Sequence, residues 1–432
     1  MFIGIAICVV FVIFAALMMT KRLSALLALP LMAIIVAVLA GLPLTGEQSI
    51  IDHVIVNGAL KLASTYVAIL FACWLSQILY KTGVTDTIIK KAAELGGDKP
   101  FVVALLLCGV SIFLFTVLFG TGAVAMVGAI VLPLMLSIGV PALAACNAFM
   151  AALSAGYTLN PANMTSLLGI TGITQEQLTP CAIILTVMGC IFTVLYLAWS
   201  FKKNGMKFAF AAPVSEAAEE EEERPMVTGV RGLLACMTPL VVVVITLVWN
   251  INALAAFFAG IIWAIIFTVK GPWKKYMSVL ADSMFDGFKE GAPTAGLMFG
   301  IGMLLNAVTA TTTQEIISPF MTAITPTTAI GLIIFACLLS PLSLYRGPFN
   351  VMGLGAGLAA SMMAVNAVPV AALAAVFYCT SRWPAQACPT ATQVVWVSNF
   401  TGYDPVNSTN EVQLSNWIFT ALSIVICVLV YM

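Results

Sequence analysis

The chain of 432 residues is 62% hydrophobic and only 8% charged, with a mean hydropathy of +1.09. A soluble domain needs far more surface charge, so this composition excludes a soluble protein and predicts an all-α polytopic membrane protein. A net charge of zero without a basic stripe argues against nucleic acid as a partner. A single histidine, His53, argues against histidine-based catalysis and multi-histidine metal sites, so we expect neither an enzyme nor a cofactor.

Apolar runs that can enter a bilayer follow one another along the chain. A spanning helix needs about 20 apolar residues, and several of these runs are shorter. If 101–138 and 327–365 are re-entrant helical hairpins, and if 142–178 and 368–402 are single broken spans, ten crossings remain, five in each half. The runs lie at 2–20, 23–42, 62–80, 101–119, 123–138, 142–159, 180–200, 232–249, 252–269, 292–309, 327–344, 348–365, 368–380 and 413–431.

The basic residues predict the orientation of these spans. With the N-terminus outside, most of the 18 Lys and Arg residues fall in cytoplasmic loops, as the positive-inside rule requires. The pair Lys21-Arg22 follows the first apolar run instead of preceding it, which favours a span over a signal peptide. We expect a multi-pass protein of the bacterial inner membrane with both termini outside. The sequon Asn407-Ser408-Thr409 would then be cytoplasmic, and we interpret it as a chance match.

The only long polar stretch lies in the middle of the chain and contains five consecutive glutamates, Glu219 to Glu223. Such a run is typical of a solvated linker, which we place in the cytoplasm at 201–231, between a first repeat at 1–200 and a second at 232–432. Positions of the second half match the first at an offset of 225 to 229 residues. The pairs are Gly58 and Gly287, Ile88 and Ile316, Gly122 and Gly347, Gly128 and Gly353, Pro141 and Pro369, and Pro161 and Pro389.

The number of crossings predicts how the two repeats are related. Five crossings is an odd number, so the second repeat enters the membrane from the opposite side and the repeats are inverted. Inverted repeats are typical of secondary transporters, because two copies in opposite orientation let one site open to either face in turn.

Glycine and proline interrupt the apolar runs at four places, and the repeat pairs them. The turn of the first hairpin is Gly120-Thr121-Gly122, and its counterpart is Tyr345 to Asn350. The first broken span is interrupted at Asn160 to Ser166, and its counterpart runs from Ser381 to Thr392. Backbone groups freed at such breaks can bind an ion or an anion.

The side chains at these breaks predict a substrate class. Short hydroxyls and amides suit sodium or the oxygens of a small polar solute. The two arginines, Arg346 and Arg382, favour an anionic solute, because a guanidinium matches a carboxylate in bidentate geometry. The alternative is that each arginine caps carbonyl groups at its own turn or extends to the membrane surface.

Acidic residues are expected to lie outside the spans. The segments 47–60 and 273–290 are predicted to be interfacial helices, with Asp282, Asp286 and Glu290 as a charged stripe that faces water or headgroups. A proton-coupled carrier usually needs a titratable group in its path, so this placement favours sodium, or a proton carried by the substrate, as the coupling ion. The eleven cysteines are expected to be small core residues rather than ligands or disulfides.

Two segments resemble the citrate/divalent-metal symporter family, namely Met18 to Leu29 and Gly287 to Ala295. More broadly, the duplicated pattern of hairpin and broken helix resembles the ion transporter superfamily. That resemblance implies a homodimer whose transport part moves as an elevator. The first hairpin tip lacks the aspartate and threonine expected of metal-citrate symporters, which argues against metal-citrate cotransport but leaves organic-anion transport.

The resemblance also implies where substrate and ion bind. The substrate would contact Thr121, Gly122, Asn160, Asn163, Thr165, Arg346, Gly347, Asn350, Arg382, Thr390 and Thr392. Sodium would bind at Gly120, Thr121, Asn163 and Thr390. The main hypothesis is therefore a secondary active transporter of a small organic anion, a di- or tricarboxylate or a related carboxylate. Alternatives are a cation/proton antiporter of the same superfamily and a permease subunit that depends on a solute-binding partner.

Overall fold

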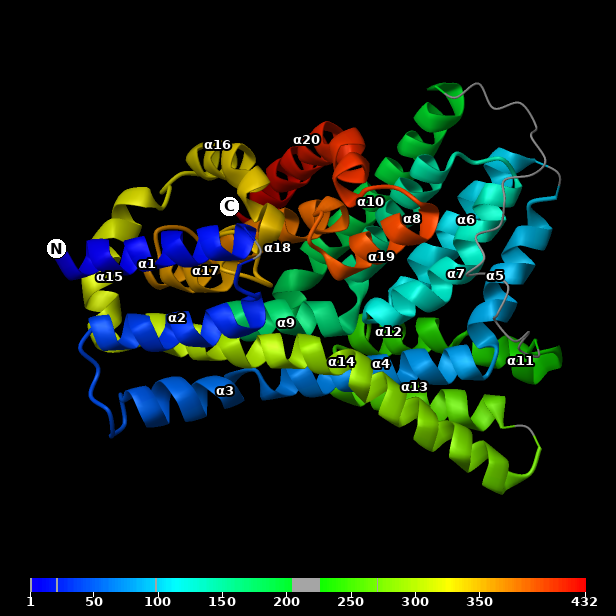
Figure 1. Ribbon diagram of the computed structural model, residues 1–432, viewed down its shortest axis with the longest axis horizontal. Helices are drawn as coiled ribbons and strands as arrows, with labels where there is room; N and C mark the ends of the chain where they lie inside the picture. Colours follow the sequence, from blue (N-terminus) through cyan, green and yellow to red (C-terminus); the bar gives the residue numbers. More distant parts are fainter. Residues whose placement is uncertain (1, 21, 98, 204–225, 270) are drawn as a thin grey trace.

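The computed structural model describes residues 2–20, 22–97, 99–203, 226–269 and 271–432. Every regular element in this part of the chain is a helix (Figure 1), which confirms the predicted all-helical class. Most of the predicted linker, including all five consecutive glutamates, lies outside the described residues.

Helices make up the described parts of both halves of the chain. The first half contains α1 (Phe2–Met19), α2 (Ala25–Leu39), the π-helix η1 (Ile50–Asn57), α3 (Gly58–Lys61), α4 (Ala63–Lys81), α5 (Val84–Leu95), α6 (Pro100–Phe115), α7 (Thr121–Ser137), α8 (Ala142–Leu159), α9 (Pro161–Thr171) and α10 (Gln175–Lys203). The second contains α11 (Gly229–Cys236), α12 (Thr238–Leu247), α13 (Ala253–Thr268), α14 (Trp273–Thr309), α15 (Thr311–Ile324), α16 (Ala329–Leu339), the 3-10 helix η3 (Ser340–Arg346), α17 (Gly355–Ala364), α18 (Val370–Ala387), α19 (Thr392–Thr401) and α20 (Pro405–Tyr431).

Six helical stretches of the described chain are long and apolar enough to cross a membrane, and a bent pair, α11 with α12, would make a seventh. Seven shorter apolar helices accompany them. These helices fit the predicted membrane protein, whereas the count of ten crossings and the re-entry of the hairpins stay predictions. The six stretches are Ile50–Lys81, Ala142–Leu159, Gln175–Lys203, Trp273–Thr309, Ala329–Arg346 and Pro405–Tyr431.

The two predicted interfacial helices are not separate elements. The segment 273–290 continues without interruption into the apolar run that follows it, so α14 is one helix of 37 residues. Likewise, η1 and α3 lead into α4. Glu290 therefore lies in the middle of a helix that is long and apolar enough to cross a membrane. The placement of the acidic residues outside the membrane-spanning segments stays a prediction. The sequence analysis ended the interfacial helix where the polarity of the side chains changes. The backbone hydrogen bonds of a helix continue across such a change.

All four predicted chain breaks are present. Residues 116–120 separate α6 from α7, and 347–354 lie between η3 and α17. Asn160 separates α8 from α9, and 388–391 separate α18 from α19. The last of these breaks is shorter than predicted, because α18 continues through Arg382 to Ala387.

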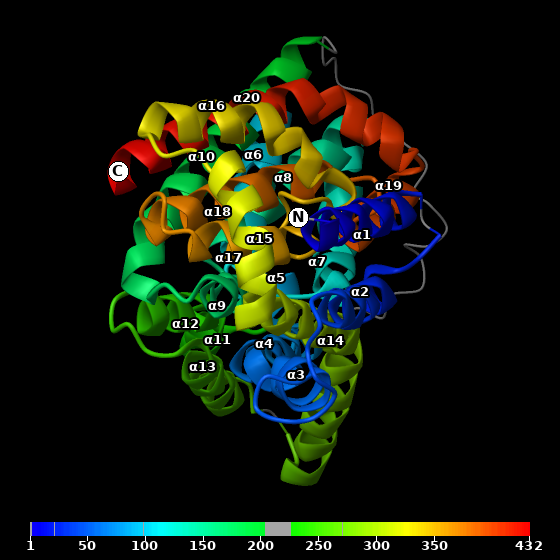
Figure 2. The same ribbon diagram turned by 90° about the vertical axis from the view of Figure 1, so that its left-hand side faces the viewer.

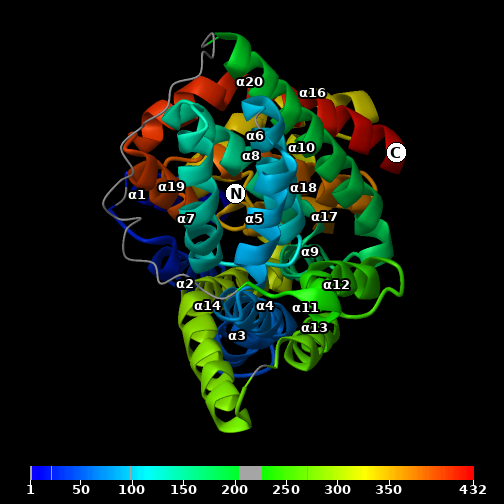
Figure 3. The ribbon, with the colours of Figure 1, turned by 90° about the vertical axis from the view of Figure 1, so that its right-hand side faces the viewer.

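The helices form two groups (Figures 1 and 3). In one group, α14 packs along α2, α3 and α4, with α13 on the other side of α4. In the other group, α6, α8, α10, α18 and α20 pack on one another, and α7 and α19 lie against α8. Viewed from the end that carries the N-terminus, the two groups lie one above the other (Figure 2). The break between α6 and α7 contacts α4 at Phe119 and α14 at Gly122, which places it at the boundary between the groups.

Candidate functional site

A cavity of about 500 Å³ lies where the chain breaks meet α14 and the start of α2. This volume is in the usual range for small-molecule sites. Seven of the predicted residues line it, although they are far apart in sequence. They are Gly120, Thr121, Asn163, Arg346, Asn350, Arg382 and Thr392.

Five predicted residues do not line the cavity. Two of them, Thr165 and Thr390, make polar contacts within their own segments, and two are glycines that lie close to other groups. Thr165 donates its hydroxyl to the carbonyl of Pro161 within its own helix. Thr390 lies 3.2 Å from the sulfur of Cys388. A Cβ at Gly347 would lie 2.0 Å from the carbonyl oxygen of Leu342. A Cβ at Gly122 would lie 2.0 Å from the carboxylate of a residue that does line the cavity, Glu290.

Asn160, the fifth, holds two breaks together. Its Oδ1 accepts a hydrogen bond from the N–H of Ala162, 3.0 Å away, and so caps the start of α9. Its Nδ2 donates to the carbonyls of Phe115 and Leu118 at the end of α6, at 3.0 and 3.1 Å. The Asn160 amide is therefore occupied by the backbone, which makes it a structural residue rather than a ligand for solute.

Arg382 is almost completely buried, with 7% of its surface exposed. Nη1 donates to Oδ1 of Asn163 at 3.0 Å, and the guanidinium carbon lies 5.3 Å from the ring centre of Tyr378. Its Nε has no hydrogen-bond partner within the described chain. A buried guanidinium without a carboxylate is costly, so this group is available for an anion.

Arg346 is the last residue of η3, and it has a φ angle of 58°, next to Tyr345 with a φ angle of 55°. Non-glycine residues in this region are uncommon and cluster at functional sites. Nη1 of Arg346 donates to the carbonyl of Met352 at 3.0 Å, so one nitrogen caps its own turn. The ion pairs found in the described chain, Lys81 with Asp286 and Lys203 with Glu411, leave both arginines without a carboxylate.

Two helix N-termini meet at the same cavity. Thr121 begins α7, Thr392 begins α19, and their hydroxyl oxygens are 2.9 Å apart. Helix N-termini carry partial positive charge and unpaired N–H groups. Together with the two arginines they make the cavity electropositive on one side, and this arrangement suits a small anion with more than one acidic group.

Sequence reasoning missed Glu290, the one carboxylate among the residues that line the cavity in the described chain. Glu290 was assigned to the water-facing stripe with Asp282 and Asp286. Only its position relative to α4, which a sequence does not show, could have revealed that it lines the cavity. The other polar lining residues, which were not predicted as ligands, are Ser24, Ser154, Tyr157, Thr294, Ser381, Gln386, Cys388 and Gln393. Ser381, Gln386 and Cys388 belong to the predicted break at 381–392, whereas the others lie outside the predicted breaks, where a sequence shows no sign of which face a side chain occupies.

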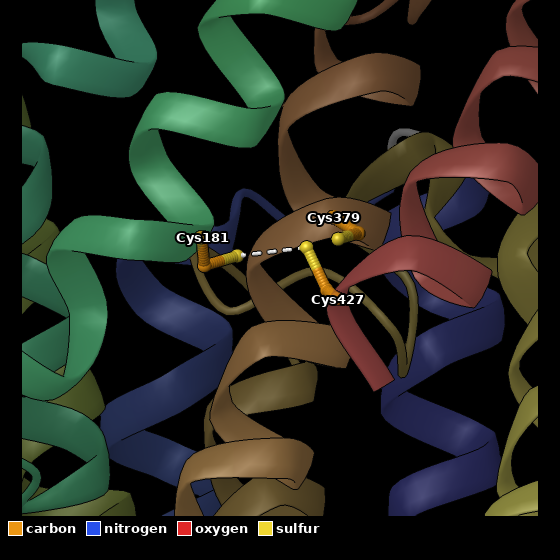
Figure 4. Close-up of side chains that lie close together, drawn as sticks. All are labelled: Cys181, Cys379 and Cys427. Atoms are coloured by element: carbon orange, nitrogen blue, oxygen red, sulfur yellow. Dashed lines mark hydrogen bonds between the residues drawn. The ribbon is translucent and has the colours of Figure 1, made fainter. Parts of the chain in front are cut away.

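All eleven cysteines are free thiols, and three of them come together from different helices (Figure 4). The sulfur atoms of Cys181 in α10, Cys379 in α18 and Cys427 in α20 all lie within 4.8 Å of one another. Cys427 donates to the sulfur of Cys181 at 3.5 Å. The group contains no histidine or carboxylate, and neutral thiols of this size pack as small apolar residues. It therefore joins the three helices by packing.

Comparison of the chain with models of protein families and with curated proteins finds no match to either. The function is therefore argued from the cavity and the residues around it.

Proposed function

We propose that the protein is a secondary active transporter of a small organic anion, a di- or tricarboxylate or a related carboxylate, that works by ion-coupled, elevator-type alternating access. The observation that carries this proposal is that Arg346 and Arg382 line one cavity at the boundary between two groups of helices. Neither arginine has a carboxylate partner in the described chain. A dicarboxylate can engage both guanidinium groups in charge-assisted hydrogen bonds.

Contacts of α3 and α4 with α14 support an inverted repeat. A Cβ at Gly58 would lie 2.7 Å from Cα of Met303, and a Cβ at Gly287 would lie 2.6 Å from Cα of Trp74. Gly58 corresponds to Gly287, and Trp74 corresponds to Met303, at the same offset of 229 residues. A two-fold axis produces this pattern. If one residue of the first half contacts one residue of the second half, the equivalents of these two residues also contact each other.

Polar side chains repeat the same reciprocity. Lys61 donates to Oδ1 of Asn306 at 2.9 Å, and Gln77 donates to Oε1 of Glu290. At the offset of 229 residues, Lys61 is equivalent to Glu290 and Gln77 to Asn306. Each half thus supplies one charged side chain and one amide. The two pairs lie at opposite ends of the contact that α3 and α4 make with α14.

A third contact supports an axis that also passes through the second group of helices. The hydroxyl of Ser154 donates to the carbonyl of Arg382 at 3.0 Å, and these residues are equivalent at an offset of 228. A residue that contacts its own equivalent lies on the axis. The cavity is therefore close to the axis, where a site can open to either side in turn.

Purified protein tests the proposal through thermal shifts with mono-, di- and tricarboxylates, each with and without sodium, because a ligand of the native state raises its stability. We expect one class of acid to stabilise the wild type, and we expect Arg346→Ala and Arg382→Ala to abolish the shift and uptake into liposomes. Arg231→Ala, at an exposed position, is the matched control. Full transport by both cavity variants would contradict the carboxylate assignment.

The proposal also covers the oligomeric state and the location of the protein. The protein would be a homodimer in the bacterial inner membrane with both termini outside. Transport by the purified protein alone in liposomes would exclude a permease subunit that needs a solute-binding partner.

One observation favours the second candidate, a cation/proton antiporter, because Glu290 places a carboxylate in the cavity. The two candidates differ in whether ion movement requires an organic solute. An antiporter moves protons against sodium without any organic solute, so proton flux driven by a sodium gradient alone in liposomes would favour it.

A further inference from the structure

The side chain of Glu290 is half-buried in the cavity wall, and its two oxygens are in different situations. Oε1 accepts a hydrogen bond from Nε2 of Gln77 on α4. Oε2 is buried and has no hydrogen-bond partner within the described chain. An ionised carboxylate with one unsatisfied buried oxygen is costly, and binding a proton or a cation removes that cost.

The glycines of the first hairpin make room for this carboxylate. A Cβ at Gly122 would lie 2.0 Å from Oε1 and 2.3 Å from Oε2, so any larger residue there would displace Glu290. Gly122 is the second residue of α7, whose N-terminus has no side-chain cap. The carboxylate therefore lies at the positive end of α7, at the same tip where Thr121 lines the cavity.

Other charged and titratable groups surround Glu290. On its own helix, Asp286 lies one turn earlier and is ion-paired with Lys81 of α4. Cys73 of α4 and Tyr157 of α8 are ordinarily neutral, and Cys73 donates to the carbonyl of Phe119 at the hairpin tip. Arg346 and Arg382 line the same cavity. When Glu290 is ionised, it competes with a substrate carboxylate for this positive field.

We propose that Glu290 is the binding site of the coupling proton in the transporter proposed above. The carboxylate takes up one proton to become a carboxylic acid, and the cavity loses its one negative charge as the organic anion enters. The amide of Gln77 serves both states, because it donates N–H to the carboxylate and, turned about its last torsion, accepts the O–H of the acid. Binding of proton and anion is then reciprocal.

The ligand set favours a proton over sodium. A metal cation needs several oxygen ligands around it, as hard cations do in proteins. Here Oε1 is occupied by an N–H donor, and Oε2 has no hydrogen-bond partner in the described chain. A single unpartnered oxygen can take up a proton without any further ligand.

The first arm of the test needs no organic substrate. Infrared difference spectra of the purified protein on acidification should show a carboxylic acid band that is absent from Glu290→Gln and retained in Asp286→Asn, the matched control one turn away. A spectrum of Glu290→Gln that keeps the full band would overturn the proposal, whatever the protein transports.

The second arm uses radiolabelled succinate and citrate in proteoliposomes with the membrane potential clamped. An inward gradient of one pH unit should support accumulation of up to about tenfold per proton in the wild type and in Asp286→Asn, since one pH unit is 1.36 kcal/mol. Glu290→Gln should exchange solute across the membrane without accumulating it. Proton-driven accumulation by Glu290→Gln, or sodium-driven accumulation unchanged by this substitution, would contradict the inference.

The two arms separate the failures. If the wild type transports neither acid, the proposed function fails while the infrared arm still reports on Glu290. If Glu290→Gln does not fold, as gel filtration would show, Gly122→Ala serves instead, because its Cβ would displace the carboxylate from the tip. Gly122→Ala should then equilibrate the solute across the membrane without accumulating it, and wild-type accumulation would count against the inference.

Discussion

At the residue scale, the cavity depends on amides that hold charged groups in place. Asn163 is the clearest case, because its Oδ1 accepts from Arg382 while its Nδ2 donates to the carbonyl of Tyr157 at 3.1 Å. The amide therefore fixes the guanidinium without neutralising it. A carboxylate in this position would complete an ion pair and remove the unsatisfied positive charge that an anionic solute needs.

This arrangement predicts the effect of Asn163→Asp. The new carboxylate should pair with Arg382 and weaken binding of the organic anion by about 10- to 100-fold, as expected from losing a hydrogen bond to a charged group. Thermal stability without ligand should change little, because the new ion pair with Arg382 offsets the loss of the hydrogen bond that Nδ2 of Asn163 donates to the carbonyl of Tyr157. Ligand-induced thermal shifts measure both effects, and Asn366→Asp, at an exposed position, is the control. Undiminished anion binding by Asn163→Asp would show that Arg382 does not contact the solute.

At the element scale, α3 and α4 approach α14 closely because a glycine lies at each of two contacts, Gly58 in α3 and Gly287 in α14. Gly58 lies against the backbone of Met303, and Gly287 lies against the backbone of Trp74. Small residues at helix contacts let backbones approach and are a main source of packing energy inside membranes. The separation between α4 and α14 also places Gln77 within reach of Glu290.

Valine at Gly58 or at Gly287 should therefore destabilise the protein. Each Cβ would meet backbone atoms at 2.6 to 2.7 Å, so the helices must move apart, and overpacking of this kind costs about 1–3 kcal/mol. The two variants should behave alike if the repeat is real. Melting temperatures in detergent provide the measurement.

Gly109→Ala in α6 is the control for this prediction, because a Cβ there would meet nothing within 4 Å. That change should be neutral or stabilising by about 0.5–1 kcal/mol, since alanine is the better helix former. If Gly58→Val and Gly287→Val unfold at the wild-type temperature, the close contact of α3 and α4 with α14 does not exist.

At the scale of the whole molecule, the proposed transporter needs two opposite-facing arrangements, and the described structure would be one of them. The first hairpin tip is held by α4, where the hydroxyl of Ser76 accepts from the N–H of Phe119 at 3.0 Å. In an inverted repeat the opposite-facing state exchanges the roles of the halves. The second hairpin tip should then lie against α14, with Leu344 near Leu305, the equivalents of Phe119 and Ser76.

Cysteine cross-linking tests this exchange. In a background without the native cysteines, the pair at 76 and 119 should cross-link in the state described here, and the pair at 305 and 344 should cross-link in the opposite state. Conditions that raise one yield should lower the other, because the two states share one population. A pair at 305 and 344 that never cross-links under any ion or substrate condition would contradict the inverted repeat.

Much of the fold was predictable because it depends on local chemistry. The all-helical class and the chain breaks follow from hydropathy, glycine and proline, whose effects act within a few residues. The extent of α18 was harder to predict, because Pro384 suggests a break near Arg382 but the helix continues to Ala387. The seven residues that meet at the cavity were found at the breaks, where a membrane-embedded chain must expose polar groups.

By itself, the sequence determined the membrane environment, the helices and the places where they break, because burial in lipid leaves a chain few alternatives. Only the tertiary structure decided which polar groups face the cavity. Asn160 and Thr165 bond to nearby backbone, whereas Asn163, three residues after Asn160, orients Arg382 from another helix. Glu290 joins the cavity only because α14 is continuous and packs on α4, and neither property is visible in a local pattern of polarity.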